Sequence, residues 1–361
     1  MNILYLSHLS GVSYAGPTYS VPKQIESQSR IDNVFWYNAI KSERTEWKSL
    51  PFYHDIEEYP KESIKSLPEP FNHPDLIVAE LFYNMFGSPL IRELVNGCIP
   101  YVIVPRGELT AKAQKRKMMK KALANIIICR KYARKAAAIQ YLTSRERTDS
   151  GEKWNSKAIV IPNGIDNPIK RKKKYCESGI KCVSIGRIEP YQKGLDLLIE
   201  ACSRIKSDLV KAGCSVTICG PDNENRLAEL RKYVYDYGLK KVVFFHDGVF
   251  GKEKEELILD SDVFLITSRF EGHPMALIEA LSYGLPCVAT DGSNMREEVD
   301  TFKAGWTCDS SVDGICSALL SMIKDRDHIR EYGEKAIVLS NQYNWDSIAK
   351  KTHEEYRKLL G

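Results

Sequence analysis

The chain has 361 residues, which is enough for about two domains, each with a core of its own. Hydrophobic residues make up 43% and charged residues 27%, as in an ordinary globular protein, and no run of about 18 apolar residues is present to span a membrane. The net charge of +5 is modest and no basic strand is studded with aromatic residues, so nucleic acid is not an expected partner.

The first residues, MNILYLSHLS, have no basic stretch ahead of their apolar run. They predict a first strand rather than a signal peptide, and a cytoplasmic location. The ten cysteines include no pair two residues apart, and no two histidines have helical ligand spacing. We therefore expect reduced, structural cysteines and neither a metal nor another cofactor.

Short apolar runs alternate with polar or helical stretches, which predicts βαβ units and doubly wound parallel sheets. In the first half these runs occupy residues 2–7, 75–81, 101–107, 137–144 and 158–166. A basic, turn-rich stretch at 167–179, NPIKRKKKYCESG, is the expected linker. The alternation then restarts at residues 181–188, 216–222, 242–248, 262–268 and 286–292. The final stretch, YNWDSIAKKTHEEYRKLL, spaces its apolar residues as on an amphipathic helix.

Ligands of such sheets bind beyond the carboxyl ends of the strands, so residues that follow a strand are the candidates for a site. Gly11 and Gly16 follow the first strand and would let the backbone approach a ligand, although a plain turn explains them equally well. Arg106 comes just after a later strand. Arg187 and Lys193, in GRIEPYQKG, could together neutralise a diphosphate. A solvated basic loop remains the alternative for that pair.

Two carboxylates follow the strand at 262–268, in the stretch RFEGHPMALIEALSYGLPCVAT. Pro274 suits the first turn of a helix and Gly284 the position just past its end. The start of that helix would offer backbone N–H groups to a phosphate, whereas Glu271 and Glu279 would accept hydrogen bonds from hydroxyl groups. An exposed loop residue and an exposed helix residue are the alternative interpretation of the two glutamates.

A basic segment spans residues 112–135, with ten Lys or Arg and no acidic residue. Its apolar residues, spaced by three and four, predict a helix with one buried and one basic face; they are Met118, Met119, Leu123, Ile126 and Ile127. The basic face would suit anionic lipid headgroups or a lipid diphosphate, and a solvated helix is the alternative. Its candidate contact residues are Lys115, Arg116, Lys117, Lys120 and Lys121.

Several motifs together resemble the retaining GT-B glycosyltransferases of family 4. They are IPNGID at 161–166, GRIEPYQKG at 186–194, and Glu271 followed by Glu279 ahead of ALSYGLPCVAT. The resemblance covers nearly the whole chain, including PRGEL, YLTSRE and the closing helix. It implies two Rossmann-like α/β domains facing across a cleft, with an acceptor domain at 1–168 and a nucleotide-sugar donor domain at 169–342. The helix at about 343–361 is expected to pack back on the first domain.

The resemblance also implies an activity. The expected reaction moves a sugar, with retention, from a nucleotide sugar to a glycan or lipid-linked saccharide, and family habit favours UDP and bacterial surface polysaccharide biosynthesis. The cytoplasmic enzyme could contact the inner face of the plasma membrane. The implied catalytic residues are Glu271, Arg187 and Lys193. The implied donor-binding residues are Gly16, Arg106, Val249, Gly272, His273, Pro274, Met275, Ala276 and Glu279.

In this interpretation Arg187 and Lys193 bind the diphosphate, Glu271 reads the transferred sugar and Glu279 reads the ribose. The chain departs from many relatives at PRGELT, where they carry a histidine, so Arg106 or Glu108 would have to serve there. The sequence DSD at 260–262 resembles the metal-binding Asp-x-Asp of another glycosyltransferase fold. Its place between a helix and a strand favours a turn, and we expect metal-independent activity.

Two other functions remain open. A nucleotide-sugar epimerase can share this architecture, but it needs acid and base residues and the expected cleft offers few histidines, mainly His8, His246 and His273. A two-lobed protein that binds a sugar without chemistry is the other, and the absence of an export signal weighs against it.

Overall fold

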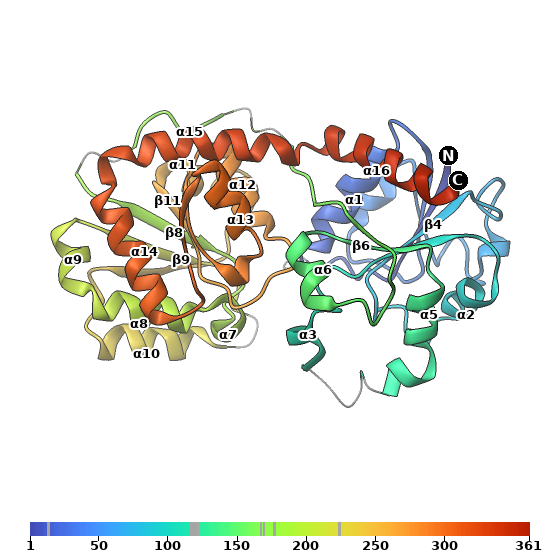
Figure 1. The fold of residues 1–361 in the computed structure, drawn as a ribbon, viewed down its shortest axis with the longest axis horizontal. Coiled ribbons are helices and arrows are strands. Elements are labelled where there is room, and N and C mark those ends of the chain that lie inside the picture. The colour runs from blue at the N-terminus through green and yellow to red at the C-terminus, as the bar shows by residue number, and fades with distance from the viewer. Residues whose placement is uncertain are drawn as a thin grey trace. The chain divides into compact units, whose positions relative to one another are not determined.

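The computed structural model describes residues 1–12, 15–115, 121, 123–166, 168, 170–175, 178–222 and 225–361. The chain divides into two compact units (Figure 1). The first unit combines Met1–Gly164 with Trp345–Gly361, and the second is Ile165–Asn344. The sequence predicts these divisions after residues 168 and 342, four residues later and two residues earlier than the structure has them.

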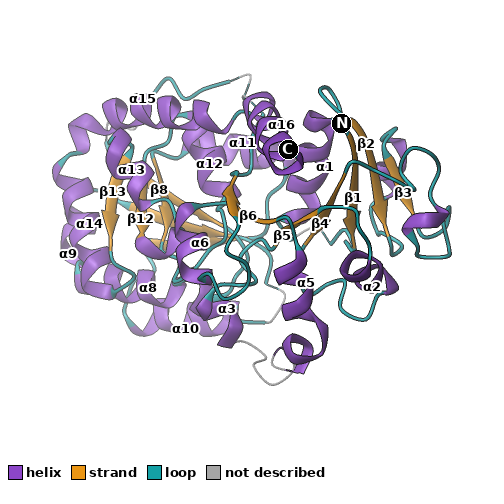
Figure 2. Ribbon diagram, turned by 45° about the vertical axis from the view of Figure 1, so that its right-hand side comes forward, coloured by secondary structure: helices purple, strands orange, loops and turns teal. Residues whose placement is uncertain are grey.

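The first unit is built on a sheet of seven parallel strands in the order β3-β2-β1-β4-β5-β6-β7. The strands are β1 (Asn2–Ser7), β2 (Asn33–Asn38), β3 (Tyr53–Asp55), β4 (Leu76–Glu80), β5 (Tyr101–Val104), β6 (Ala138–Tyr141) and β7 (Ala158–Val160). Every residue of β4, β5 and β6 is buried, because helices cover both faces of the sheet (Figure 2). These helices are α1 (Pro17–Gln28), α2 (Pro89–Asn96), α3 (Ala111–Lys115), α5 (Arg130–Lys135), α6 (Ser144–Ser150) and α16 (Trp345–Leu360).

The last helix, α16, packs on α1. The indole of Trp345 fills the space beside Gly164, where a Cβ would lie 2.4 Å from the ring. The hydroxyl of Tyr356 is buried and donates to Oε1 of Gln140 at 2.7 Å. The closing helix is therefore part of the first unit, joined to it by core contacts and not only by the chain.

The second unit has six parallel strands in the order β10-β9-β8-β11-β12-β13. They are β8 (Lys181–Ile185), β9 (Ser215–Cys219), β10 (Val243–His246), β11 (Val263–Ile266), β12 (Cys287–Thr290) and β13 (Gly305–Cys308). The helices are α7 (Pro190–Lys193), α8 (Leu195–Arg204), α9 (Lys206–Lys211), α10 (Leu227–Asp236), α11 (Gly251–Asp260), α12 (Met275–Tyr283), α13 (Arg296–Phe302), α14 (Val312–Lys324) and α15 (Ile329–Ser340).

Both sheets follow the doubly wound order in which the third, second and first strands precede the fourth. The strand order therefore reverses between β1 and β4 in the first unit and between β8 and β11 in the second. Ligands of doubly wound sheets bind beyond the carboxyl ends of the strands at this switch point. The loops that follow β8 and β11 are thus the first place to look for a site in the second unit.

Two sequence predictions need correction. Three strands were not expected from the sequence: β2 (NVFWYN), β3 (YHD) and β13 (GWTC). The stretch at 167–179 was expected to be a linker, but its described residues are attached to the second unit. Nζ of Lys172 lies 3.3 Å from Oδ1 of Asp262, and the hydroxyl of Tyr175 donates to the carbonyl of Gly284 at 2.7 Å. Side-chain contacts therefore hold this segment on the second unit, although its composition predicted a linker.

Candidate functional site

The loop after β8 turns sharply because two glycines allow close backbone approaches. A Cβ on Gly220, after β9, would lie 1.7 Å from the carbonyl oxygen of Gly186. Gly194 has a φ of +62°, and a Cβ there would lie 2.0 Å from the carbonyl oxygen of Thr267. The hydroxyl of Thr267 in turn donates to the carbonyl of Lys193 at 3.0 Å. The β8 and β11 loops are thereby tied together at the switch point.

Lys193 and Glu271 meet across these two loops. Nζ of Lys193 lies 2.5 Å from Oε1 of Glu271, and the hydroxyl of Ser268 donates to the same oxygen at 2.7 Å. The Lys193 side chain is 23% exposed and that of Glu271 is 10% exposed. The pair is therefore partly desolvated, where a charge-assisted hydrogen bond is strong, yet it remains open to an incoming ligand.

Arg187 adds a second positive charge to the loop that carries Lys193. One of its terminal nitrogens donates to Oε1 of Gln192 at 3.2 Å, and the guanidinium makes no other hydrogen bond or ion pair with the described residues. Because a guanidinium carries five donors, most of them are available to a ligand. The predicted pair of Arg187 and Lys193 thus lies on one loop, with Lys193 engaged by Glu271.

The helix α12 begins just beyond Glu271. Pro274 is the residue immediately before the helix, and its carbonyl accepts from the N–H of Leu277 at 3.0 Å. Met275 and Ala276 are the first two helical residues, whose N–H groups have no partner within an α-helix. The end of the helix therefore carries partial positive charge toward the loop. Gly284 ends the helix with a φ of +96°, in the position expected from the sequence.

Asn294 fixes the backbone of the loop that leads into α12. Its φ is +60°, and its side-chain amide donates to the carbonyls of Glu271 and Gly272. His273, predicted to bind the donor, has only 8% of its surface exposed and its ring centroid lies 5.3 Å from that of Tyr343. Its imidazole is therefore packed into the second unit, so His273 would offer its backbone rather than its ring.

Glu279, the second predicted carboxylate, lies one turn into α12. Its Oε2 is 2.6 Å from Nζ of Lys254 on α11, and both side chains are about a third exposed, at 30% and 27%. The sequence did not indicate Lys254, because the pairing joins two helices on either side of β11 and depends on how they pack. Val249, predicted near the nucleobase, is buried, with 4% of its surface exposed.

The DSD sequence lies at the other edge of the sheet, before β11. Asp262 is buried and accepts from the backbone N–H of Lys181 at 2.9 Å, and Asp260 pairs with Nζ of Lys181 at 2.9 Å. These carboxylates are therefore structural. Among the described residues no three His, Cys, Asp or Glu side chains are grouped as metal ligands.

In the first unit Arg106 was predicted to touch the donor. It follows β5 with a φ of +49°, and its side chain is 4% exposed. Its guanidinium bonds Oε2 of Glu80 at 2.7 Å, and it donates to side-chain oxygens of Ser20, Gln24 and Asn163. Because these four side chains engage the buried guanidinium, it is not available to a ligand. We correct its role to the positioning of the PRGEL turn.

Two further glutamates, one half-buried and one buried, hold the same turn. The carboxylate of Glu108 accepts from the backbone N–H groups of Phe82 and Tyr83, and burial raises its pKa. The carboxylate of Glu146 accepts from Gly107 and, at 2.7 Å, from Leu142, and burial raises its pKa to about 7. Glu146 was not predicted from the sequence, although TSRE is a capping box in which a threonine precedes a glutamate by three residues.

Gly16 precedes α1 in open space, because no heavy atom lies within 4 Å of the point that a Cβ would occupy. Its backbone could be approached by a ligand, as the sequence predicted, but no contact in the structure assigns it that role. His8, which follows β1, is enclosed: its Nδ1 lies 3.1 Å from the carbonyl of Asn84, and burial lowers its pKa.

The predicted basic helix is described only in part. Lys115 ends α3, whereas Arg116, Lys117 and Lys120 lie outside the described residues. Nζ of Lys121 donates to the carbonyl of Ala113 at 2.7 Å and lies 4.9 Å from the ring centroid of Tyr83. Leu123, expected on the buried face, is 61% exposed.

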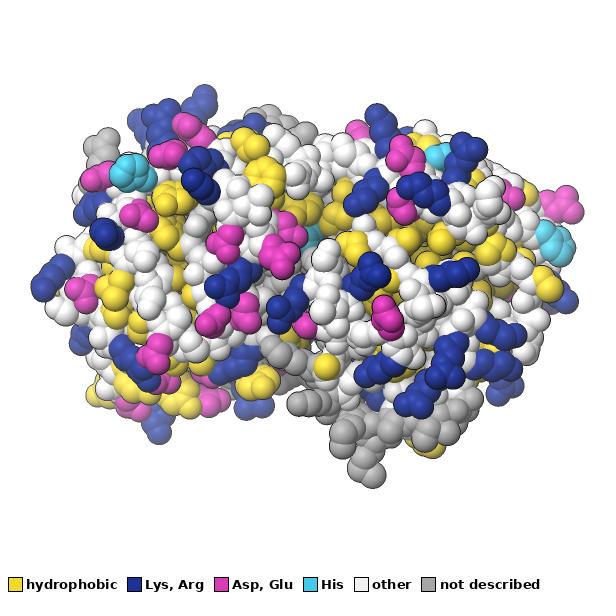
Figure 3. All heavy atoms as spheres, in the orientation of Figure 1, with side chains coloured by type: hydrophobic (Ala, Val, Ile, Leu, Met, Phe, Trp, Pro, Cys, Tyr) yellow, Lys and Arg dark blue, Asp and Glu magenta, His cyan; other side chains and the backbone are white. Residues whose placement is uncertain are grey.

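The helix α5 carries the last four basic residues of the segment 112–135. Its exposed side chains are Arg130, Lys131, Arg134 and Lys135, and the two residues between them face the core. Figure 3 shows Lys and Arg side chains gathered over this part of the first unit. No described helix has both the length and the apolar character that a membrane crossing requires.

The fold and the switch-point loops define a class. Two parallel Rossmann-like units, each in the same strand order, make this a GT-B fold, and solved structures agree with it. The sucrose-phosphate synthase from Thermosynechococcus elongatus superposes with a TM-score of 0.75 over 99% of each chain, at 14% identity. HepE of Anabaena, solved in complex with UDP and glucose, gives 0.70 over 99% of this chain and 100% of its own, at 17% identity.

The sequence comparisons point to the same class. The model for glycosyl transferases group 1 matches residues 166–338, which lie in the second unit. The putative colanic acid biosynthesis glycosyltransferase WcaL of Salmonella typhimurium is 30% identical over 155 residues, 41% of this chain and 37% of its own length. The chain spans between about a third and a half of the first curated relatives that it matches.

Proposed function

We propose that the protein is a retaining glycosyltransferase of the GT-B class, family 4, which moves a sugar from a nucleotide-sugar donor to a glycan or lipid-linked saccharide. The observation that carries the proposal is the cluster at the second switch point. There Arg187, Lys193 and Glu271 lie on two adjoining loops beside the N-terminus of α12. The match of this unit to glycosyl transferases group 1 supports the same conclusion.

The cluster suits a donor that carries both phosphates and hydroxyl groups. Arg187 and Lys193 neutralise the diphosphate, and the first N–H groups of α12 add partial positive charge. Glu271 accepts hydrogen bonds from hydroxyls of the transferred sugar. When the diphosphate arrives, Lys193 can turn from Glu271 toward it, which frees lone pairs of the carboxylate for those hydroxyls.

In the proposed reaction the bond between the anomeric carbon and the phosphate oxygen breaks while the acceptor oxygen bonds to the same face of that carbon. The departing diphosphate takes the bonding electron pair and then the acceptor's proton. Charge therefore develops on the diphosphate, where preorganised cations lower the barrier most. Two protein cations are at hand for this charge, so the proposal includes no metal and no protein nucleophile.

Relatives support a proposal for the donor and the product. HepE of Anabaena binds UDP and glucose in its structures, and UDP is the nucleotide that we propose here. WcaL is named as a putative glycosyltransferase of colanic acid biosynthesis, and we propose that this protein also acts in the synthesis of a polysaccharide. The exposed cations of α5 and the exposed Leu123 support a contact with the anionic inner face of the plasma membrane, where a lipid-linked acceptor would lie.

The test combines binding and product analysis. Thermal unfolding is followed with UDP, GDP and ADP sugars, because a ligand at a hundred times its Kd stabilises the native state by about 2.7 kcal/mol. Glu271→Gln and Arg187→Met should abolish sugar transfer, whereas Glu334→Gln, an exposed carboxylate on α15, should not. Stabilisation by a UDP sugar, together with a product that keeps the donor's anomeric configuration, is the expected result.

Two outcomes would replace the proposal. Conversion of the donor sugar to its epimer without any acceptor would indicate an epimerase. Binding without release of free nucleotide, over a broad acceptor panel, would indicate a sugar-binding protein.

A further inference from the structure

A cavity in the first unit lies between α2 and the segment 64–73. Its volume is about 480 Å³, within the range of small-molecule sites. Its lining includes Ile77, at the start of β4, and Ile99, just before β5. It therefore lies at the amino ends of the strands, the opposite sheet edge from the turn around Arg106. Nothing in the proposed transfer reaction uses it.

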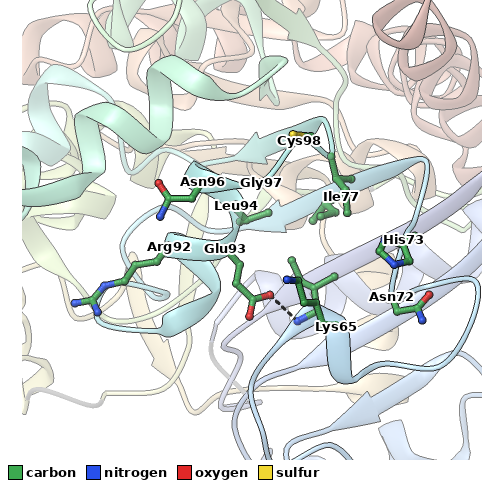
Figure 4. A pocket seen from close by; sticks show the side chains of 12 residues that line it. Lys65, Asn72, His73, Ile77, Arg92, Glu93, Leu94, Asn96, Gly97 and Cys98 are labelled. Atoms are coloured by element: carbon green, nitrogen blue, oxygen red, sulfur yellow. Dashed lines mark hydrogen bonds between the residues drawn. The ribbon is translucent and has the colours of Figure 1, made fainter.

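The two walls of the cavity are held in place. One wall is α2, which begins at Pro89 with the Ser88 hydroxyl accepting from a backbone N–H. The other is the segment 64–73, where the N–H of His73 donates to the carbonyl of Pro70 at 3.1 Å. The N–H of Ile64 donates to Oε2 of Glu93 at 2.9 Å and so joins the walls, as the dashed line in Figure 4 shows. A ligand would enter a preformed site and lose little free energy in ordering it.

The cavity has an apolar floor and a positive rim. Its apolar side chains are Ile64, Ile77, Leu94 and Ile99. In Figure 4 Arg92 and Asn96 lie at one end, and Asn72 and His73 lie at the other. The side chains of Lys65, Arg92 and His73 make no hydrogen bond or ion pair with any described residue, while the carboxylate of Glu93 accepts from the N–H of Ile64. The unsatisfied charge in the cavity is therefore positive.

From this arrangement we propose that the cavity binds a monomeric organic anion with a short aliphatic body and one phosphate or carboxylate group. The body covers the isoleucine floor, since burying apolar surface is favourable. The anionic group lies at the rim, where Lys65 supplies a positive charge. A ligand without the acidic group would leave this lysine unpaired, and one without the aliphatic body would leave the floor in water.

Cys98 gives a direct report of occupancy. It lines the cavity and is exposed, whereas every other described cysteine is buried or half-buried. Its rate of reaction with a thiol reagent should fall when the cavity is filled. Cys98→Ser removes this signal and identifies it among the other thiols. The measurement needs no donor sugar and no activity, so its outcome is separate from that of the proposed transfer reaction.

The experiment uses octyl phosphate as the probe and the full chain. We expect it to slow labelling of Cys98 at least about fivefold, and Lys65→Glu to weaken the protection about tenfold, since a charge-assisted hydrogen bond is lost. The matched control is Lys61→Met, an exposed lysine outside the cavity, which should leave protection unchanged. Circular dichroism and thermal unfolding establish that each variant is folded.

Three results would overturn the proposal. Equal protection by octylammonium would show that charge is not recognised, and equal protection by inorganic phosphate would show that the aliphatic body is not. Protection by vesicles of anionic lipid but not by monomeric octyl phosphate would assign the surface to a membrane instead.

Discussion

Glu146 offers the most direct test of the buried network in the first unit. Its carboxylate is fully buried, accepts from the N–H groups of Gly107 and Leu142, and has its pKa raised by burial from 4.5 to about 7. The perturbation is Glu146→Gln, which keeps the shape of the side chain but cannot titrate. One amide oxygen replaces one carboxylate oxygen, whereas the amide NH2 now faces the second N–H donor.

The sign follows from proton linkage. A folded pKa above the unfolded one means that protons stabilise the native state, so this stability is complete below about pH 4.5 and is lost as pH rises through about 7. A pKa that is about 2.5 higher in the folded than in the unfolded state corresponds to roughly 3 kcal/mol of stability. The facing NH2 group adds a cost of about 1–3 kcal/mol that does not depend on pH. The variant should thus be least stable relative to the wild type in acid, with the difference shrinking by roughly 3 kcal/mol toward pH 8.

Urea unfolding of both proteins at pH 5, 6, 7 and 8 measures this difference directly. Because every other titrating group is shared, the difference between the two curves isolates Glu146. A free-energy difference that stays constant across the series would refute the reasoning. It would mean that the carboxylate is ionised throughout, and that its two N–H donors outweigh its burial.

Three further substitutions test individual contacts. Gly194→Ala places a Cβ 2.0 Å from the carbonyl oxygen of Thr267, at a φ of +62°. It should lower the free energy of unfolding by about 2 kcal/mol or more and Tm by several degrees. An unchanged Tm would contradict the close approach of the two loops. Glu279→Gln should weaken nucleotide binding about tenfold, and unaltered affinity in calorimetry would remove its proposed ribose contact. Tyr356→Phe leaves the buried Oε1 of Gln140 unpaired and should cost about 1–3 kcal/mol in urea unfolding, whereas a neutral effect would mean that the hydrogen bond contributes nothing.

Much of the fold is readable because local pattern and buried position agree. Each apolar run expected as a strand coincides with one in the structure, since strands buried on both faces have to be continuously apolar. The three strands that were missed break this pattern in different ways. β2 begins and ends with an asparagine, β3 has three residues, and β13 begins at Gly305 and has four residues. In all three, pairing with a neighbouring strand overrides a weak local signal.

In the site, too, the sequence could place the residues that follow a strand but not the contacts between separate elements. Lys193 and Glu271 could be placed because each follows a recognisable strand, and parallel strands bring their carboxyl ends to one edge of the sheet. The partner of Glu279 could not be foreseen, because Lys254 comes from another helix. Nor could the burial of Arg106, because it depends on Glu80, a charged residue at the end of a strand that the sequence shows only as part of an apolar run.

The contrast between Arg106 and Arg187 explains how two similar sheets can differ in function. Each arginine follows a parallel strand, but Arg106 is neutralised by Glu80, Glu108 lies in the same turn, and the carboxylate of Glu146 on α6 accepts from the N–H of Gly107 in that turn. Arg187 bonds only a neutral glutamine among the described residues and keeps its charge available. An anionic group is therefore attracted to the loops of the second unit and not to the PRGEL turn of the first. If the protein transfers a sugar as proposed, the diphosphate of the donor belongs to the second unit, and the first unit contributes a neutral, rigidly held surface.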